Sequence, residues 1–222
     1  MKLKIFVGWD PREDIAWEVC RHSILSRTDP NQVTVTPLIQ SELRKQGLYT
    51  REIDTKAATE FSLTRFLTPT LAGNEGYAIF VDCDFLFLTD IRGVLDQIDP
   101  SKAVSVVKHD YQPTDTHKMD GCVQYVYPRK NWSSFMWINC SHPQVKALTP
   151  EVVNSESGMY LHRFEWLQVT VQLDREQFQV LRLLPREVCE RQRLQLHGSG
   201  GHQAHSWHEF VRARIQLVAK CQ

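Results

Sequence analysis

Two aspartates separated by one residue, Asp82 and Asp84, offer the clearest chemistry in this sequence. They directly follow the apolar run Tyr77-Ala-Ile-Phe-Val, which is typical of a central strand covered on both faces. In α/β sheets, ligands bind beyond the carboxyl ends of the strands. Mg²⁺ and Mn²⁺ prefer oxygen ligands, often one or two carboxylates completed by substrate phosphates and water. The pair therefore predicts a metal site that could bridge a diphosphate and offset its charge.

The elements around this pair predict an α/β fold. Residues 3–8 form a short apolar run, and Asp10 with Pro11 is the pattern of a helix N-cap followed by the first helical residue. Helical spacing then continues to about Arg27, and a β-branched run covers 33–39. This strand, helix and strand indicate a parallel sheet. Further on we expect helices over 59–71, 91–98 and 144–148, strands over 77–82, 103–107 and 135–138, and irregular polar segments over 40–57 and 112–131.

Composition narrows the classes of function. The 222 residues suffice for one domain with a sizeable core. Basic and acidic side chains balance at 26 each, which gives no support to a nucleic-acid partner. No apolar run reaches the roughly 18 residues of a membrane span, and the start of the chain turns polar too soon for a signal peptide. We therefore expect a cytoplasmic protein whose six cysteines are reduced thiols.

Several segments resemble one enzyme family. Phe80-Val-Asp-Cys-Asp-Phe-Leu looks like the Asp-x-Asp element of GT-A glycosyltransferases, and residues 60–69 are similar to the preceding helix of the glycosyltransferase family 8-like group. Residues 7–10 resemble the first strand and loop of that group, and residues 132–140 its later strand. The resemblance spans roughly residues 3–167. It implies a GT-A, Rossmann-like fold in a single domain, with a mostly parallel central sheet flanked by helices.

The resemblance also implies roles for individual residues. Asp82 and Asp84 would hold Mn²⁺ or Mg²⁺, and the Arg65 fork would reach the diphosphate or sugar of the donor. His109 follows a predicted strand and could line the same crevice. The remaining expected contacts are Gly8 and Asp10 beside the nucleotide, Ser62 beside the donor, and Asn139 facing the sugar as a catalytic residue with Arg65.

The chain changes character after about residue 167. The tail is rich in Gln and Arg, and contains His197-Gly-Ser-Gly. The related enzymes usually supply a third metal ligand from a late histidine, which points to His197. We therefore divide the chain into a catalytic domain, 1–167, and an atypical tail, 168–222, part of which we expect to be disordered.

The resulting hypothesis is a transferase that moves a sugar from a nucleoside-diphosphate sugar to a hydroxyl group of a carbohydrate or other acceptor. Two alternatives stay open: a non-catalytic nucleotide-sugar-binding or scaffold domain, and a phosphohydrolase that uses the Asp-x-Asp pair. The sequence leaves open the base and sugar of the donor, the acceptor and the stereochemistry of transfer.

Overall fold

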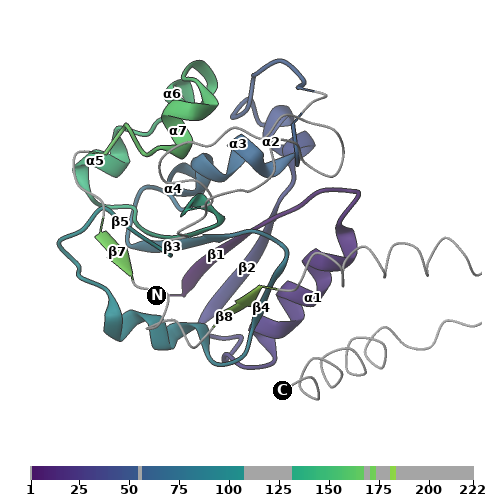
Figure 1. Cartoon of the computed structure of the whole chain (residues 1–222), viewed down its shortest axis with the longest axis vertical. Helices are drawn as coiled ribbons and strands as arrows, with labels where there is room; N and C mark the ends of the chain where they lie inside the picture. The colour runs from purple at the N-terminus through teal and green to yellow at the C-terminus, as the bar shows by residue number, and fades with distance from the viewer. Residues whose placement is uncertain (1, 55–56, 108–131, 168–170, 174–180, 184–222) are drawn as a thin grey trace, which may run out of the picture. The chain divides into compact units, whose positions relative to one another are not determined.

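Apolar runs form the centre of the structure, a computed structural model that describes residues 2–54, 57–107, 132–167, 171–173 and 181–183. Six of the described strands form one sheet in the order β2-β1-β3-β6-β5-β7 (Figure 1). Strand β6 runs antiparallel to both neighbours, and the other five share one direction. These strands are β1 (Leu3–Gly8), β2 (Val33–Leu38), β3 (Tyr77–Val81), β5 (Val104–Val107), β6 (Phe135–Asn139) and β7 (Val171–Leu173).

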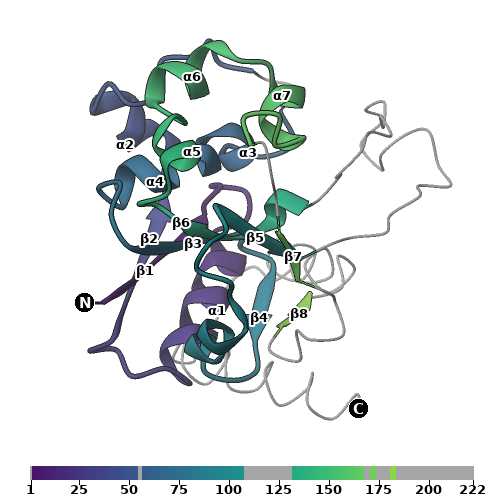
Figure 2. The ribbon, with the colours of Figure 1, turned by 90° about the vertical axis from the view of Figure 1, so that its left-hand side faces the viewer.

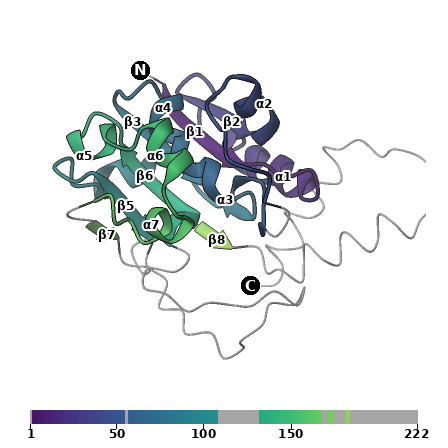
Figure 3. The ribbon, with the colours of Figure 1, turned by 90° about the horizontal axis from the view of Figure 1, so that it is seen from above.

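Helices cover both faces of this sheet. Figure 2 shows α1 on one face and α2 to α7 on the other, and Figure 3 shows the second group lying over the strands. The α-helices are α1 (Asp14–Leu25), α2 (Gln40–Lys45), α3 (Phe61–Thr64), α4 (Thr68–Leu71), α5 (Pro143–Lys146), α6 (Pro150–Ser155) and α7 (Gly158–His162). Three 3₁₀ helices are η1 (Arg65–Leu67), η2 (Ile91–Gln97) and η3 (Trp132–Ser134).

Two short strands lie apart from the main sheet. Strands β4 (Phe85–Phe87) and β8 (Leu181–Leu183) form a two-stranded sheet. The chain divides within β8 into two units, Met1–Arg182 and Leu183–Gln222, and the elements discussed below belong to the first. The predicted boundary near residue 168 stays a prediction, because most of the tail lies outside the described residues.

The main core lies between the sheet and its helices. Strand β3 is central, and Ile79, Phe80 and Val81 are fully buried. Trp137 of β6 and Phe66 of η1 are among the largest side chains removed from water. Burial of large apolar side chains on both faces favours the layered arrangement, since each stabilises the fold by about 1.5–3 kcal/mol.

Most of the predicted elements are confirmed, including the mostly parallel sheet. The prediction that Asp10 caps the first helix is wrong, because α1 begins at Asp14 with Glu13 at the N-cap position. The irregular segment predicted from residue 40 was also wrong at its start, where α2 forms. Helices α6 and α7 were not predicted. Within the described part of the chain, no helix has the length and apolar character to cross a membrane.

Candidate functional site

The carboxyl end of β3 gathers several of the predicted residues. Strand β3 is parallel to β1, with Val7 opposite Val81, so the loop that follows β1 emerges beside Asp82. Strand β6 is antiparallel to β3, with Phe135 opposite Val81, so the residues that precede β6 reach the same edge. The Asp82 backbone N–H donates to the Ser134 carbonyl at 2.9 Å, which ties that segment to the strand end.

Arg65 and Asp82 form the centre of this site. Arg65 Nη1 lies 2.9 Å from Asp82 Oδ1, with the arginine side chain 7% and the aspartate side chain 22% exposed. The guanidinium also lies over the ring of Phe80, 4.9 Å from its centroid, and 5.5 Å from that of Phe61. The guanidinium therefore packs against two neighbouring aromatic rings, whose low polarity strengthens its attraction for a nearby anion.

Backbone carbonyls fix the direction of this guanidinium. Arg65 Nε donates to the carbonyls of Phe61 and Ser62 at 3.2 and 3.1 Å, and Nη1 donates to the Ser133 carbonyl at 2.9 Å. Although Nη1 is close to Asp82, Asp82 Oδ1 is buried and makes no hydrogen bond. The ion pair therefore rests on charge, and an acceptor lone pair remains for a further ligand.

The electrostatics of Asp82 favour a cation. Burial, together with the charges of Asp84 and Glu13, raises the pKa of this carboxyl to about 7, against the lowering effect of Arg65. A carboxylate that is costly to ionise beside a second carboxylate is stabilised in its charged form by a bound cation.

The side chains at this edge fit a divalent metal in part. Asp82 and Asp84 supply two carboxylates, which is a usual protein contribution to a Mg²⁺ or Mn²⁺ shell completed by phosphates and water. Among the residues that the structure describes, no group of three or more His, Cys, Asp and Glu side chains could hold a metal ion. A metal at this place would therefore take its other ligands from the donor, from water or from residues outside the described ranges.

Asp10 lies at the same edge, but its oxygens are used within the protein. The side chain is fully buried, and it accepts hydrogen bonds from Arg12 and from the Glu60 backbone N–H. Its carboxylate thus pins the loop after β1 to the residue that precedes α3. This long-range contact, rather than helix capping, explains why an aspartate stands at this position.

Gly8 allows a close approach of that same helix. A Cβ added at Gly8 would lie 2.5 Å from the ring of Phe61. Because Phe61 also contacts the Arg65 guanidinium, the missing side chain at Gly8 helps to bring α3 against the sheet edge. Ser62 contributes its backbone carbonyl to Arg65, while its hydroxyl bonds to the Thr59 N–H at 3.3 Å.

Asn139 does not join this group. It pairs in register with Tyr77, at the opposite end of β3 from Asp82. Its amide donates to the Pro100 carbonyl at 3.1 Å, and its side-chain oxygen accepts from the Ser141 N–H at 3.2 Å. Tyr77 and Asp82 are five residue steps apart along the chain, roughly 16 Å at 3.3 Å per residue. The expectation that Asn139 faces the sugar is corrected by the antiparallel direction of β6.

Two other predicted residues, His109 and His197, lie outside the described residues, so their roles stay predictions. Two residues that were not singled out, Ser133 and His162, do lie in this neighbourhood. Ser133 supplies a carbonyl to Arg65, and its hydroxyl is 2.8 Å from His162 Nδ1. No motif pointed to His162, because the short helix that carries it was not predicted.

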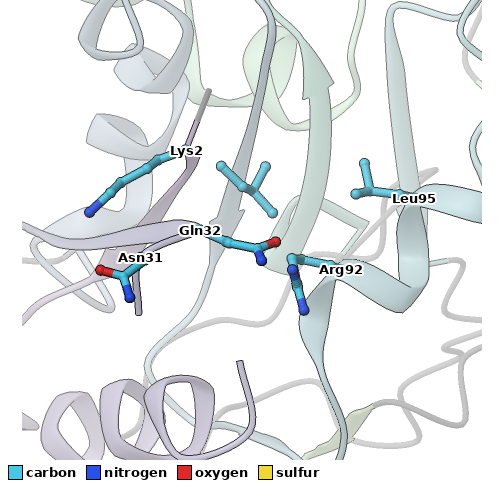
Figure 4. Close-up of a pocket in the computed structure, with 6 residues that line it drawn as sticks. Lys2, Asn31, Gln32, Arg92 and Leu95 are labelled. Carbon is cyan, nitrogen blue, oxygen red and sulfur yellow. The ribbon is translucent and has the colours of Figure 1, made fainter. Parts of the chain in front are cut away.

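A surface cavity of about 450 Å³ lies at the amino ends of β1 and β2, opposite the carboxyl ends that carry Asp82. Figure 4 shows Lys2, Asn31, Gln32, Arg92 and Leu95 around it, and Leu3 completes the lining. Lys2 and Leu3 stand at the amino end of β1, and Gln32 directly precedes β2. Because ligands of α/β sheets bind beyond the carboxyl ends of the strands, this cavity is not the candidate site.

Comparison with solved structures supports the fold. The structure is similar to the apo structure of the bifunctional glycosyltransferase WbbM, with a TM-score of 0.51 and 13% identity over 78% of this chain and 38% of that chain. The chain has the fold of GT-A glycosyltransferases. The glycosyltransferase GlyE of Streptococcus pneumoniae TIGR4 resembles it with a TM-score of 0.48 and 10% identity, over 81% of this chain and 46% of that one. At these identities the likeness concerns the fold alone.

Comparison with curated sequences gives a much closer relative of unspecified activity. Protein CDI of Arabidopsis thaliana is 57% identical over 165 residues, which cover 74% of this chain and 63% of that protein. This chain therefore spans less than two thirds of the length of that relative. No protein-family profile matches the chain.

Proposed function

We propose that this protein is a metal-dependent glycosyltransferase, which moves a sugar from a nucleoside-diphosphate sugar to a hydroxyl group of a carbohydrate or other acceptor. The observation that carries the proposal is the pair of carboxylates, Asp82 and Asp84, at the carboxyl end of the central strand of a GT-A fold, with Arg65 2.9 Å from Asp82. The narrower likeness to the family 8-like group is part of the proposal.

Each residue of the site has a role in this proposal. Asp82 and Asp84 would hold Mn²⁺ or Mg²⁺, which when bound stabilises the charge of the departing diphosphate. Arg65 is preoriented by the carbonyls of Ser62 and Ser133, and it would contribute a fixed positive charge beside that diphosphate. Gly8 stands where the nucleotide would approach the sheet edge. Asn139 is left out of the site because it lies at the other end of β6.

We also propose that the protein acts in the cytoplasm. The described cysteines Cys20, Cys83 and Cys140 are buried free thiols. Free thiols persist in a reducing compartment.

A non-catalytic nucleotide-sugar-binding domain is the second candidate. It draws on the finding that the described residues assemble two carboxylates at this edge and no group of three or more candidate metal ligands. Such a domain would bind the donor without releasing the nucleoside diphosphate. Binding and turnover are therefore measured separately.

Binding is tested by thermal unfolding with UDP-, GDP-, ADP- and CMP-sugars, each with and without Mn²⁺. A donor at 100 times its Kd stabilises the native state by about 2.7 kcal/mol, which is roughly 5–10 °C for a chain of this size. We expect one donor to give such a shift only with Mn²⁺, and Asp84→Asn to abolish the shift.

The matched control is Asp99→Asn, which removes an exposed carboxylate that accepts from the Ser101 N–H at 2.9 Å before β5. It should keep the donor shift. A shift that persists without Mn²⁺, or that survives Asp84→Asn, would remove the metal from the proposal. No shift with any donor, from a protein that unfolds cooperatively, would count against nucleotide-sugar binding.

A further inference from the structure

His162, the last residue of α7, contacts two segments that meet at the candidate site. Its Nδ1 lies 2.8 Å from the Ser133 hydroxyl oxygen. The ring also packs edge-on against Phe66 of η1, with 5.2 Å between centroids. The histidine therefore joins α7 to the segment before β6 and to η1.

One hydrogen-bond partner of His162 is a residue that aims Arg65. Arg65 Nη1 donates to the Ser133 carbonyl at 2.9 Å, and Phe66 directly follows Arg65 in η1. A shift of the Ser133 segment would move a carbonyl that the guanidinium uses. The ring of His162 thus supports the frame that holds Arg65 against Asp82.

The imidazole of His162 is neutral in the fold. Burial and the charge of Arg65 lower the pKa of His162 to about 3. A neutral imidazole carries a proton on one ring nitrogen and accepts a hydrogen bond at the other.

We propose that His162 is a positioning residue that sets the Arg65 guanidinium against Asp82 by holding Ser133. Its consequence for turnover rests on the proposed function. His162 does not touch the reacting atoms, and it acts through the orientation of Arg65. A fixed cation stabilises developing charge better than a mobile one, because it does not need to reorganise.

The positioning itself is tested without any donor, by ¹⁵N NMR of the whole chain. We expect the His162 ring to be neutral at pH 7, with one protonated nitrogen. We also expect the Arg65 Nε–H to exchange slowly with water in the wild type, and at least about tenfold faster in Ser133→Ala and His162→Phe because its carbonyl partners loosen. A ring protonated at both nitrogens, or unchanged exchange in both variants, would overturn the proposal.

The control is His142→Gln. The Nδ1 of His142 accepts from the Gln144 N–H at 3.3 Å at the start of α5, in the segment that follows Asn139 and so lies at the opposite end of β6. The variant His142→Gln removes a histidine whose Nδ1, like that of His162, makes a hydrogen bond. It should leave the exchange of Arg65 Nε–H unchanged. If the control also speeds that exchange, the effect is general loosening and the positioning role fails.

Steady-state kinetics with the donor found above then separate this role from a purely structural one. At saturating donor and Mn²⁺, we expect kcat to fall about tenfold or more in His162→Phe, while His142→Gln keeps the wild-type value. His162→Gln, which keeps a hydrogen-bonding group for the Ser133 hydroxyl, should recover part of the loss. Wild-type kcat in His162→Phe would contradict the positioning role, whereas an inactive wild type with the expected NMR result would contradict the proposed function alone.

Discussion

The buried carboxylate of Asp10 makes the clearest quantitative prediction about the frame of the site. Its Oδ1 accepts from the Arg12 backbone N–H and Nε, both at 2.9 Å. Its Oδ2 accepts from Arg12 Nη2 at 2.7 Å and from the Glu60 N–H at 3.0 Å. Asp10→Asn keeps the shape of the side chain, removes its charge and replaces one acceptor oxygen with a donor NH₂ group.

The magnitude follows from these contacts. Each carboxylate oxygen accepts from two donors, so either orientation of the new amide sets its NH₂ group against two N–H groups. A hydrogen bond to a charged group contributes about 1.5–3 kcal/mol. Arg12 is 53% exposed, which reduces the contribution of its ion pair. We expect a loss of about 2–3 kcal/mol in the free energy of unfolding, or roughly 5–10 °C in Tm.

Urea and thermal unfolding at pH 7 measure this loss, with Asp29→Asn as the matched control. Asp29 accepts from the Asn31 N–H at 2.9 Å, the same two-residue pattern as Asp10 with Arg12, but its side chain is exposed. We expect the control to lose clearly less stability. If Asp10→Asn loses no more than the control, the reasoning that Asp10 pins the first loop to α3 is wrong.

The same carboxylate also gives a pH dependence. Burial raises the pKa of Asp10, but its hydrogen bonds to Arg12 and Glu60 outweigh burial and hold the pKa below its ordinary value of 3.8. A lowered folded-state pKa stabilises the protein above the unfolded value and ceases to do so as pH falls through the folded value. The stability difference between the wild type and Asp10→Asn should therefore shrink below about pH 4. Urea unfolding at pH 7 and pH 3 measures it, and an unchanged or larger difference at pH 3 would contradict the assignment.

Three further predictions concern neighbouring residues. Gly8→Ala should cost about 1–3 kcal/mol in urea unfolding, because the new Cβ meets the Phe61 ring at 2.5 Å; a neutral result would show that the ring yields. Lys4→Met should lower stability by roughly 1 kcal/mol through loss of the 2.6 Å bond from Nζ to the Ala72 carbonyl after α4, and an unchanged Tm would discount that bond. The pKa of His162 is lowered from 6.5 to about 3, so the unfolded state binds more protons between these values and stability should fall as pH drops below 6.5. His162→Phe should flatten that slope, and an equal slope would show that His162 is not its source.

The elements with continuous apolar runs could be predicted from the sequence. The end of the sheet that carries the candidate site could be predicted as well. Strand β3 reads as central because its residues are apolar and end abruptly in Asp82. The position of Arg65 on the preceding helical segment was also predicted. Its contact with Asp82 follows from the fold, since η1 and the end of β3 are brought together by packing rather than by sequence spacing.

Other features depend on contacts that no local pattern reveals. The sequence of residues 135–139 does not indicate that β6 is antiparallel to its neighbours. This direction is what separates Asn139 from the site. The role of Asp10 depends on Glu60, 50 positions further along the chain. Helices α6 and α7 could have been found from their caps, because Thr149 precedes Pro150 and Ser157 accepts the Tyr160 N–H at 3.1 Å.

The release of nucleoside diphosphate from the bound donor tests the central claim most directly. It is measured over a Mn²⁺ titration for the wild type, Asp84→Asn and the control Asp99→Asn. We expect release to require Mn²⁺ in the wild type and in the control. In Asp84→Asn we expect the rate to fall by at least about a hundredfold, because a metal stabilises the transition state by several kcal/mol. Equal release after removal of metal by a chelator, or a wild-type rate in Asp84→Asn, would contradict the claim that this pair of carboxylates holds the metal that serves the donor.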